Sequence, residues 1–182
     1  MTAPPLVRRA LELADRLQFK GSCISEVGLL LHVLAAQRGR SRVGEIGTGT
    51  GVSAAWIVSA LPPDVPFVTV ESDPERARAA ADLFREDANL RVLAGDWREL
   101  MPPEAPFDLL FYDGGGKQRP DLDGEQVVAL LAPGGTIVMD DLTAGRSGPD
   151  PVRQFWLGHA RLAAIEIMTT PVTAAVVAVR SL

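Results

Sequence analysis

Short runs of apolar residues alternate with amphipathic segments along most of the chain. Five runs have the length and composition of buried strands, at residues 42–46, 66–72, 90–94, 107–113 and 135–140. The segments between them space their apolar residues as helices do, at residues 52–61, 74–87 and 121–131, with a short turn near residues 96–100. Strands that alternate with helices in this way predict a parallel sheet covered by helices on both faces.

Two further helices are expected before the first strand. Apolar residues recur at helical spacing over residues 6–17, and Gly21 is expected to end that helix. A second helix is expected over residues 25–37, with Ser22 or Ser25 as its N-cap.

A hairpin of two strands is expected near the end of the chain. After a helix at residues 151–159, two apolar runs follow at residues 163–170 and 173–180. The connection between these runs is too short for a parallel crossover, so the pair must be antiparallel. The prediction is a Rossmann-like, doubly wound α/β sheet with an antiparallel hairpin at one edge.

Length and charge narrow the class of protein. The 182 residues suit a single domain, with N-terminal helices in residues 1–40 and the sheet in residues 41–182. With 18 basic and 23 acidic residues the net charge is −5, which lacks the basic excess of a nucleic-acid binder. Cys23 is the single cysteine and permits no disulfide within the chain. No apolar run approaches the ~20 residues that span a bilayer, so a cytoplasmic protein without nucleic-acid or membrane partners is expected.

A glycine-rich turn follows the first predicted strand, in the stretch Glu45-Ile46-Gly47-Thr48-Gly49-Thr50-Gly51-Val52-Ser53. Such a turn lets a ligand approach the backbone and aims helix N-terminal N–H groups at it. Three glycines at alternate positions exceed what a tight turn requires, which favours ligand binding. The third glycine comes one position early for the dinucleotide pattern G-x-G-x-x-G, and no Gly-Lys-Ser/Thr of a phosphate-binding loop follows.

The pattern E-x-G-x-G-x-G resembles motif I of the class I S-adenosylmethionine-dependent methyltransferases. The resemblance implies a seven-stranded sheet in the order 3-2-1-4-5-7-6 with strand 7 antiparallel, and S-adenosylmethionine as cofactor. It also implies cofactor contacts from Glu45, Gly47, Thr48, Gly49, Thr50, Gly51 and Ser53.

Later segments extend the resemblance in order along the chain. Glu71 and Ser72 end the second predicted strand, where an acidic side chain can accept both ribose hydroxyls. Gly95, Asp96 and Trp97 follow the third strand, where the family places a carboxylate and an apolar wall beside the adenine. Trp97 could instead be a core residue. The stretch at residues 22–28 resembles the segment that closes over the methionine end of the cofactor.

Three carboxylates end the fourth and fifth predicted strands: Asp113, Asp140 and Asp141. Gathered at one sheet edge they would repel one another, and a divalent cation such as Mg²⁺ would resolve this. The arrangement resembles catechol and caffeoyl-coenzyme A type O-methyltransferases, which implies these three residues as metal ligands. Asp141 departs from that pattern, which has a neutral Asn, so Asp141 could instead face away while Asp113 holds the amino group of the cofactor.

Lys117 follows Asp113 by four residues, one more than the corresponding lysine in the related enzymes, because of three consecutive glycines. With Asp113 it is a candidate catalytic residue, as a base or an electrostatic helper, although an ordinary surface lysine would fit as well. The tyrosines that commonly follow this lysine are absent, so a planar catechol is not a safe guess for the acceptor.

These residues favour the interpretation that the protein is an S-adenosylmethionine-dependent methyltransferase acting on a hydroxyl oxygen of a small molecule. Whether it binds a divalent metal ion is left open. A methyltransferase acting on nitrogen, carbon or a macromolecule stays an alternative, as does a non-catalytic protein that binds the same cofactor. A nicotinamide-dependent oxidoreductase is disfavoured by the early position of Gly51. Because the related enzymes are often dimers, and an apolar VVAV segment is expected at an exposed edge, a homodimer is predicted.

Overall fold

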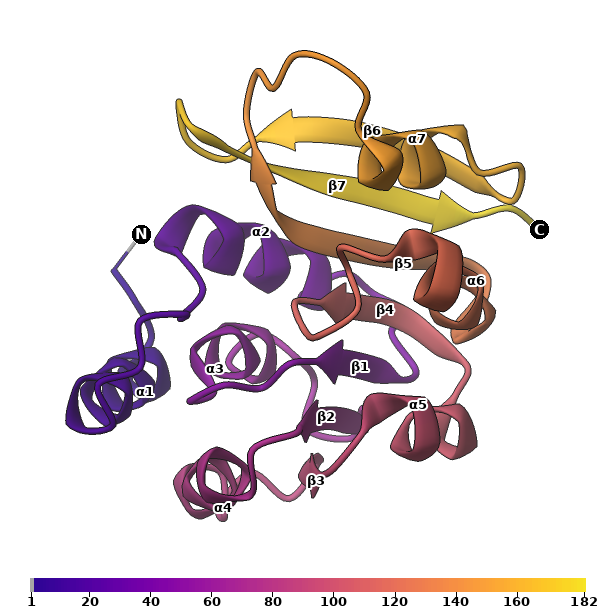
Figure 1. Cartoon of the computed structure of the whole chain (residues 1–182). Helices are drawn as coiled ribbons and strands as arrows, with labels where there is room; N and C mark the ends of the chain where they lie inside the picture. Colours follow the sequence, from indigo (N-terminus) through magenta and orange to yellow (C-terminus); the bar gives the residue numbers. More distant parts are fainter. Residues whose placement is uncertain (1) are drawn as a thin grey trace.

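A seven-stranded sheet forms the centre of the computed structural model, which describes residues 2–182 (Figure 1). The strand order is β3-β2-β1-β4-β5-β7-β6, as the family resemblance implied. Neighbouring strands are parallel from β3 to β5, whereas β7 is antiparallel to both β5 and β6. The strands are β1 (Val43–Ile46), β2 (Phe67–Glu71), β3 (Leu90–Ala94), β4 (Phe107–Tyr112), β5 (Leu131–Thr143), β6 (Leu162–Met168) and β7 (Thr173–Arg180). Met1, which belongs to the predicted N-terminal segment, lies outside the described residues.

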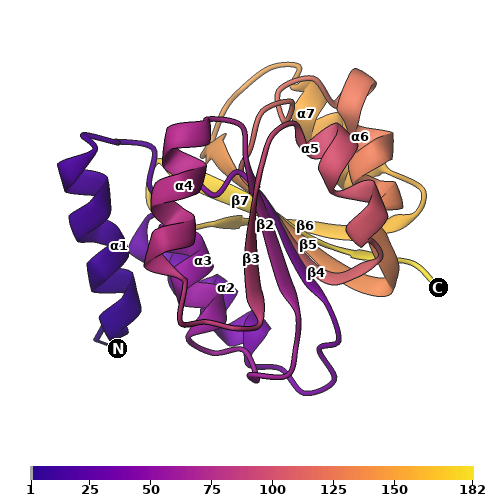
Figure 2. The same ribbon diagram turned by 90° about the horizontal axis from the view of Figure 1, so that it is seen from below.

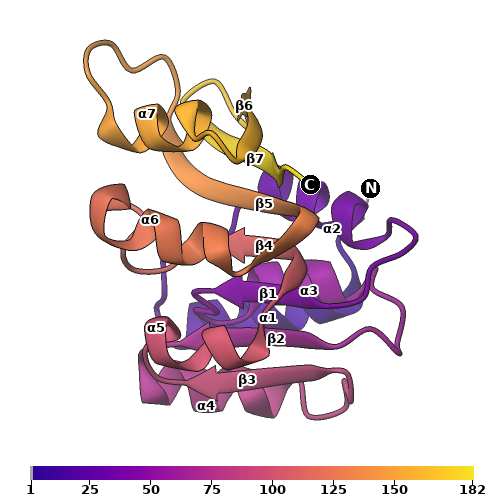
Figure 3. The ribbon, with the colours of Figure 1, turned by 90° about the vertical axis from the view of Figure 1, so that its right-hand side faces the viewer.

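Helices cover both faces of this sheet, as the alternating pattern predicted (Figures 2 and 3). One face carries α1 (Pro5–Arg16), α2 (Ser25–Ala35), α3 (Val52–Val58) and α4 (Pro74–Leu83). The other face carries α5 (Trp97–Leu100), α6 (Pro120–Ala129) and α7 (Pro151–Gly158), and a 3-10 turn, η1 (Pro102–Glu104), follows α5. No helix among residues 2–182 is long and apolar enough to cross a membrane.

Each face has its own apolar core. One core includes Leu31 and Trp56 beneath the N-terminal helices, and the other includes Met101 and Trp156 beneath α5 to α7. All four residues of β1 are buried because the strand is central and covered on both sides.

Two details of the N-terminal helices differ from the prediction. The first helix ends at Arg16 rather than near Gly21, because Gln18 takes the left-handed conformation with φ 52° and turns the chain. The second helix begins at Ser25, but Ile24 is its N-cap and no side chain caps it. Neither Ser22 nor Ser25 therefore serves as the N-cap.

The C-terminal half of the sheet also departs from the prediction. Strand β5 begins at Leu131, four residues earlier than expected, and extends through the Pro-Gly-Gly segment with a register shift against β4. Strand β7, which contains the VVAV segment, lies between β5 and β6. The edge strand on this side of the sheet is therefore β6, and the expectation that VVAV lies at an edge was wrong.

The order of the strands determines where a ligand can bind. Strands β1 and β4 are neighbours, but β1 leads into α3 on one face and β4 leads into α6 on the other. The chain therefore diverges at the carboxyl ends of these two strands, which is where open α/β sheets bind their ligands.

Candidate functional site

A cavity of about 590 Å³ opens at the carboxyl ends of the central strands, within the size range of small-molecule sites. It brings together the glycine loop, the ends of β2 and β4, and the turn after β3. Most of the predicted cofactor residues line it: Gly47, Thr48, Gly49, Thr50, Ser53, Glu71, Ser72, Gly95, Asp96, Trp97 and Asp113. Two predicted residues, Glu45 and Gly51, do not line this cavity.

The loop after β1 has a backbone that suits glycine. Gly47, Gly49 and Gly51 all have positive φ, and at Gly49 a Cβ atom would come within 2.8 Å of the Phe19 ring. The loop therefore places its backbone against the cavity with no side chain between them.

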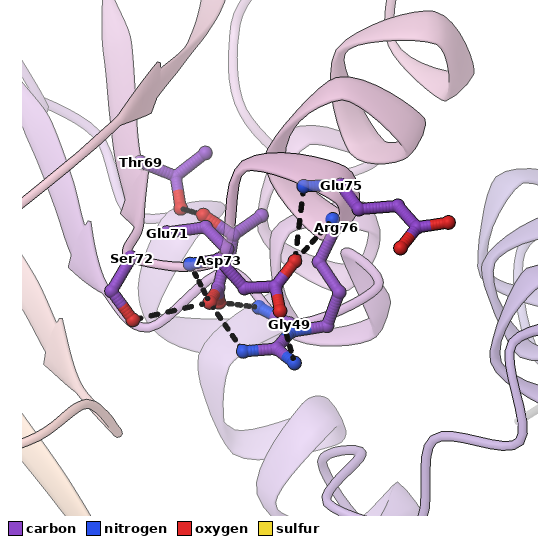
Figure 4. Close-up of polar contacts among 8 residues, drawn as sticks. Gly49, Thr69, Glu71, Ser72, Asp73, Glu75 and Arg76 are labelled. Carbon is purple, nitrogen blue, oxygen red and sulfur yellow. Dashed lines mark hydrogen bonds and ion pairs between the residues drawn. The ribbon is translucent and has the colours of Figure 1, made fainter.

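Glu71 lies at the cavity wall with a carboxylate that is held in place by several donors (Figure 4). Its Oε1 accepts hydrogen bonds from the Asp73 amide at 2.9 Å and from the Arg76 guanidinium at 2.7 Å. Its Oε2 accepts from the Gly49 amide at 2.8 Å and keeps acceptor capacity for a ligand hydroxyl. The carboxylate that was predicted to bind ribose is thus joined directly to the glycine loop.

Glu45 lies beneath the glycine loop rather than in the cavity. It is fully buried, and its Oε2 accepts a hydrogen bond from the Thr69 hydroxyl, which in turn meets the Thr48 hydroxyl at 2.6 Å. Among residues 2–182 its Oε1 has no partner. Burial raises the pKa of Glu45 to about 7, although the nearby Ser53 and Thr69 hydroxyls oppose the shift. The geometry gives Glu45 a role in fixing the loop from below.

Trp97 is both a core residue, buried beneath α5, and part of the cavity wall. Its indole Nε1 donates to the Gly115 carbonyl at 3.0 Å. The Arg98 guanidinium lies 4.9 Å from the Trp97 ring and forms a two-point ion pair with the buried Asp123, at 2.8 and 2.7 Å.

The cavity residues that were not predicted from the pattern include Phe19, Gly21, Arg76 and Arg98. Arg76 and Arg98 each stand in the first turn of a helix, and only the fold shows that their side chains point back to the cavity. Ser22 and Cys23 also line the cavity, in agreement with the resemblance noted for residues 22–28. The hydroxyls of Ser22 and Thr50 are buried without a partner in residues 2–182, so this wall fits a ligand that carries polar groups.

The three carboxylates proposed as metal ligands are not arranged as an open cluster. The Lys117 ammonium lies between Asp113 and Asp141, paired with the Asp113 carboxylate and 2.6 Å from Asp141 Oδ2. Asp140 is buried, while the Asp141 side chain is 67% exposed. Within the described part of the chain, no group of three or more His, Cys, Asp or Glu side chains is placed to hold a metal ion. These residues, as arranged here, do not fit a Mg²⁺ site.

The pKa shifts of Lys117 and Asp113 indicate different roles for the two side chains. Burial would lower the pKa of Lys117, but its contacts with Asp113 and Asp141 outweigh burial and raise it, so the ammonium stays protonated. Burial raises the pKa of Asp113 to about 6 despite the neighbouring ammonium. Lys117 can therefore act electrostatically, while a role as a general base does not suit it.

A glycine-rich turn follows β1 where the chain diverges to the two faces of the sheet, and an acidic residue ends the next strand. This combination defines a Rossmann-like domain of the kind that binds nucleoside cofactors. The sequence profile of a family described as "Methyltransferase domain" matches residues 45–142, which is more than half of the chain. The chain belongs to this methyltransferase domain family.

Individual relatives agree with this assignment. A "Putative O-methyltransferase" of Mycobacteroides abscessus is 35% identical over 138 residues, covering 72% of this chain and 63% of the relative. The chain thus spans less than two thirds of the length of this curated relative. The O-methyltransferase of Bacillus cereus in complex with SAH has a TM-score of 0.82 at 20% identity, covering 100% of this chain and 93% of that one. The O-methyltransferase TomG from Streptomyces achromogenes in complex with SAM has a TM-score of 0.80 at 23% identity, covering 99% and 91%. At these identities, the structural likenesses establish the fold.

Proposed function

We propose that the protein transfers a methyl group from S-adenosylmethionine to a hydroxyl oxygen of a small molecule. The observation that carries this proposal is the Glu71 carboxylate, held beside the Gly49 amide at the wall of a cavity of suitable size. The family assignment and the names of the relatives support the same chemistry.

Different residues of the cavity are placed to bind different parts of the cofactor. Glu71 is placed to accept hydroxyls of the ribose, and the Trp97 ring offers an apolar wall for the adenine. The glycine loop is placed to meet the polar remainder, and Ser22 and Thr50, whose buried hydroxyls have no partner among residues 2–182, also line the cavity. When bound, S-adenosylmethionine would supply a methyl group on a positively charged sulfur, so that an oxygen–carbon bond to the acceptor could form as the carbon–sulfur bond breaks and S-adenosylhomocysteine leaves.

Asp113 and Lys117 are the proposed catalytic pair. Asp113 lines the cavity at the end of β4, where its carboxylate can accept the proton that the acceptor hydroxyl loses. The Lys117 ammonium holds that carboxylate in place. The Mg²⁺ that the resemblance implied is not part of this proposal, because the Lys117 ammonium already pairs with two of the three carboxylates.

The proposal is tested by calorimetric titration with S-adenosylhomocysteine, the product of the proposed reaction. We expect binding by the wild type and a loss of at least about tenfold in affinity in Glu71→Ala, equivalent to about 1.4 kcal/mol. Glu75→Ala is the matched control, since Glu75 is exposed on the first turn of α4 and its carboxylate points away from Glu71 (Figure 4).

The outcomes separate the alternatives. An absence of S-adenosylhomocysteine binding by the wild type would contradict the methyltransferase proposal. Binding without turnover of S-adenosylmethionine across hydroxyl-bearing acceptors would favour a non-catalytic binding protein. Turnover with amines alone, or with a macromolecule, would move the proposal to that class of acceptor.

We also propose a homodimer in the cytoplasm, with residues 2–182 acting as one domain. Exposed apolar side chains occur on β6 and in the turn into β7, namely Ile165, Met168 and Val172, and β6 is one of the two edge strands of the sheet. Light scattering that gives a monomer mass at micromolar concentration would contradict the dimer.

A further inference from the structure

The acidic residues that end β4 and β5 are paired with a cation from the chain itself, the Lys117 ammonium. We infer that the Lys117 ammonium takes the place of a divalent metal ion in this chain, so that a side chain offsets part of the charge of Asp113 and Asp141 and the two carboxylates do not bind a metal. The inference concerns the charge beside the proposed methyl acceptor, and because it assumes such an acceptor it rests on the proposed function.

The contacts of Lys117 carry this inference. Its Nζ is 2.6 Å from Asp141 Oδ2 and is also paired with the Asp113 carboxylate, so one ammonium bridges two carboxylates. The Lys117 side chain is only 12% exposed and that of Asp113 is 13% exposed. Such shielding makes the pair less sensitive to salt than a surface ion pair.

The loop between β4 and α6 delivers Lys117 to this position. The Gly115 carbonyl is held by the Trp97 indole at 3.0 Å. Gly116 has φ 100°, and a Cβ atom there would come within 2.4 Å of Asp123 Oδ2. Only glycine fits at position 116. The turn brings the Lys117 side chain back to Asp113, which precedes it by four residues in the sequence.

Strand β5 delivers the second carboxylate. A register shift against β7 falls between Met139 and Leu142, and within it Asp141 takes the left-handed conformation with φ 69°. Such a bulge redirects side chains, and here Asp140 is buried while Asp141 extends to Lys117. The departure of Asp141 from the Asn of the related enzymes thus gains a reason, because only a carboxylate forms an ion pair with Lys117.

A divalent ion would compete poorly for this position. Mg²⁺ requires oxygen ligands at about 2.0–2.1 Å in octahedral geometry, and the carboxylates that could supply them are already turned toward an ammonium. A cation placed between Asp113 and Asp141 would also lie within a few ångströms of the Lys117 charge. In the proposed methyltransferase, the acceptor then needs no pair of neighbouring oxygens to chelate a metal.

The test is a titration of the metal-free full chain with Mn²⁺. Binding is monitored by electron paramagnetic resonance as the loss of the signal of the free ion. We expect no saturable binding by the wild type, and one Mn²⁺ per chain in Lys117→Ala, with affinity at least about tenfold above the wild type because a like charge is gone. Adding Asp113→Asn to Lys117→Ala is expected to abolish this new binding. Lys117→Met, which keeps the apolar stem, serves if Lys117→Ala does not fold.

The controls keep this test separate from the proposed function. Lys20→Ala removes the only other lysine charge, far along the sequence from Asp113, and is expected to bind no Mn²⁺. Saturable Mn²⁺ binding by the wild type that Asp113→Asn abolishes would overturn the inference, as would the failure of both folded Lys117 variants to bind Mn²⁺. Because Lys117 does not line the cavity whereas Asp113 does, S-adenosylhomocysteine titrated into the wild type and the single Lys117 variants tests the proposed function independently.

Discussion

The Arg76 guanidinium lies over the ring of Phe19, with 5.2 Å between the guanidinium carbon and the ring centre. Arg76 at the same time donates to the Glu71 carboxylate at 2.7 Å. Phe19 belongs to the segment between α1 and α2, whereas Arg76 and Glu71 belong to α4 and β2. The N-terminal segment therefore completes the wall beside the residue proposed to bind ribose.

The first prediction concerns this wall. Phe19→Ala removes a half-buried ring from the cavity and frees Arg76 from its stacking partner. We expect the affinity for S-adenosylhomocysteine to fall by about tenfold, measured by calorimetry, since contacts of this size contribute about 1 kcal/mol or more. Leu17→Ala is the control, because Leu17 is a partly exposed apolar residue nearby that does not line the cavity. Equal losses in both variants would contradict the prediction.

The second prediction concerns Gly49, which has φ 55° and lies under the same ring. Gly49→Ala is expected to destabilise the protein by about 1–2 kcal/mol from backbone strain, and to displace Phe19 in addition. Gly39→Ala is a matched control, since Gly39 has φ 87° and open space where a Cβ would stand. Urea unfolding and S-adenosylhomocysteine titration of both variants check this. Only Gly49→Ala should weaken ligand binding, and a similar loss in Gly39→Ala would argue against a contact with Phe19.

The third prediction concerns the support behind Trp97. Asp123 is buried and accepts two hydrogen bonds from Arg98, so Asp123→Ala leaves the guanidinium beside the Trp97 ring with Asp96 as its remaining carboxylate partner. We expect a loss of about 1–3 kcal/mol in unfolding free energy and weaker binding of the adenine part of the ligand. Asp121→Ala removes an exposed carboxylate from the same first turn of α6 and controls for the helix dipole. If both variants lose the same stability, the ion pair with Arg98 contributes nothing of its own.

The sheet and its ligand-binding edge follow from patterns that a single sequence contains. Apolar runs of strand length, separated by helical spacing, have few arrangements other than a doubly wound sheet. The glycines at alternate positions after β1 and the acidic residue that ends β2 identify the cavity, because parallel strands bring those ends together.

The remaining features depend on side-chain directions that no local pattern encodes. Phe19 reaches the cavity because Gln18 turns the chain in the left-handed conformation, which nothing in the residue type required. Asp140 and Asp141 are adjacent in sequence, and only the bulge in β5 sends one into the interior and the other to Lys117. Glu45 was expected at the cofactor, but alternation along β1 places it beneath the loop.

Burial of Glu45 has a consequence for the pH dependence of stability. The folded pKa is about 7, above the ordinary value of 4.5, because burial disfavours the charged carboxylate and the nearby Asp113 and Glu71 charges add to the effect. Below pH 4.5 the side chain is protonated in both states and carries no penalty. As the pH rises from 4.5 to 7 the unfolded chain releases this proton first, so the unfolding free energy falls and then levels off.

Glu45→Gln removes this titration while keeping the size of the side chain. We expect the unfolding free energy of the variant, relative to the wild type, to rise by about 3 kcal/mol between pH 4.5 and pH 8. Urea unfolding of both proteins across this range measures the difference, and titrating groups that do not interact with Glu45 cancel because both proteins share them. A difference that does not change with pH would mean that the Glu45 carboxylate is ionised in the folded protein, and that the glycine loop is built over a buried charge rather than a neutral acid.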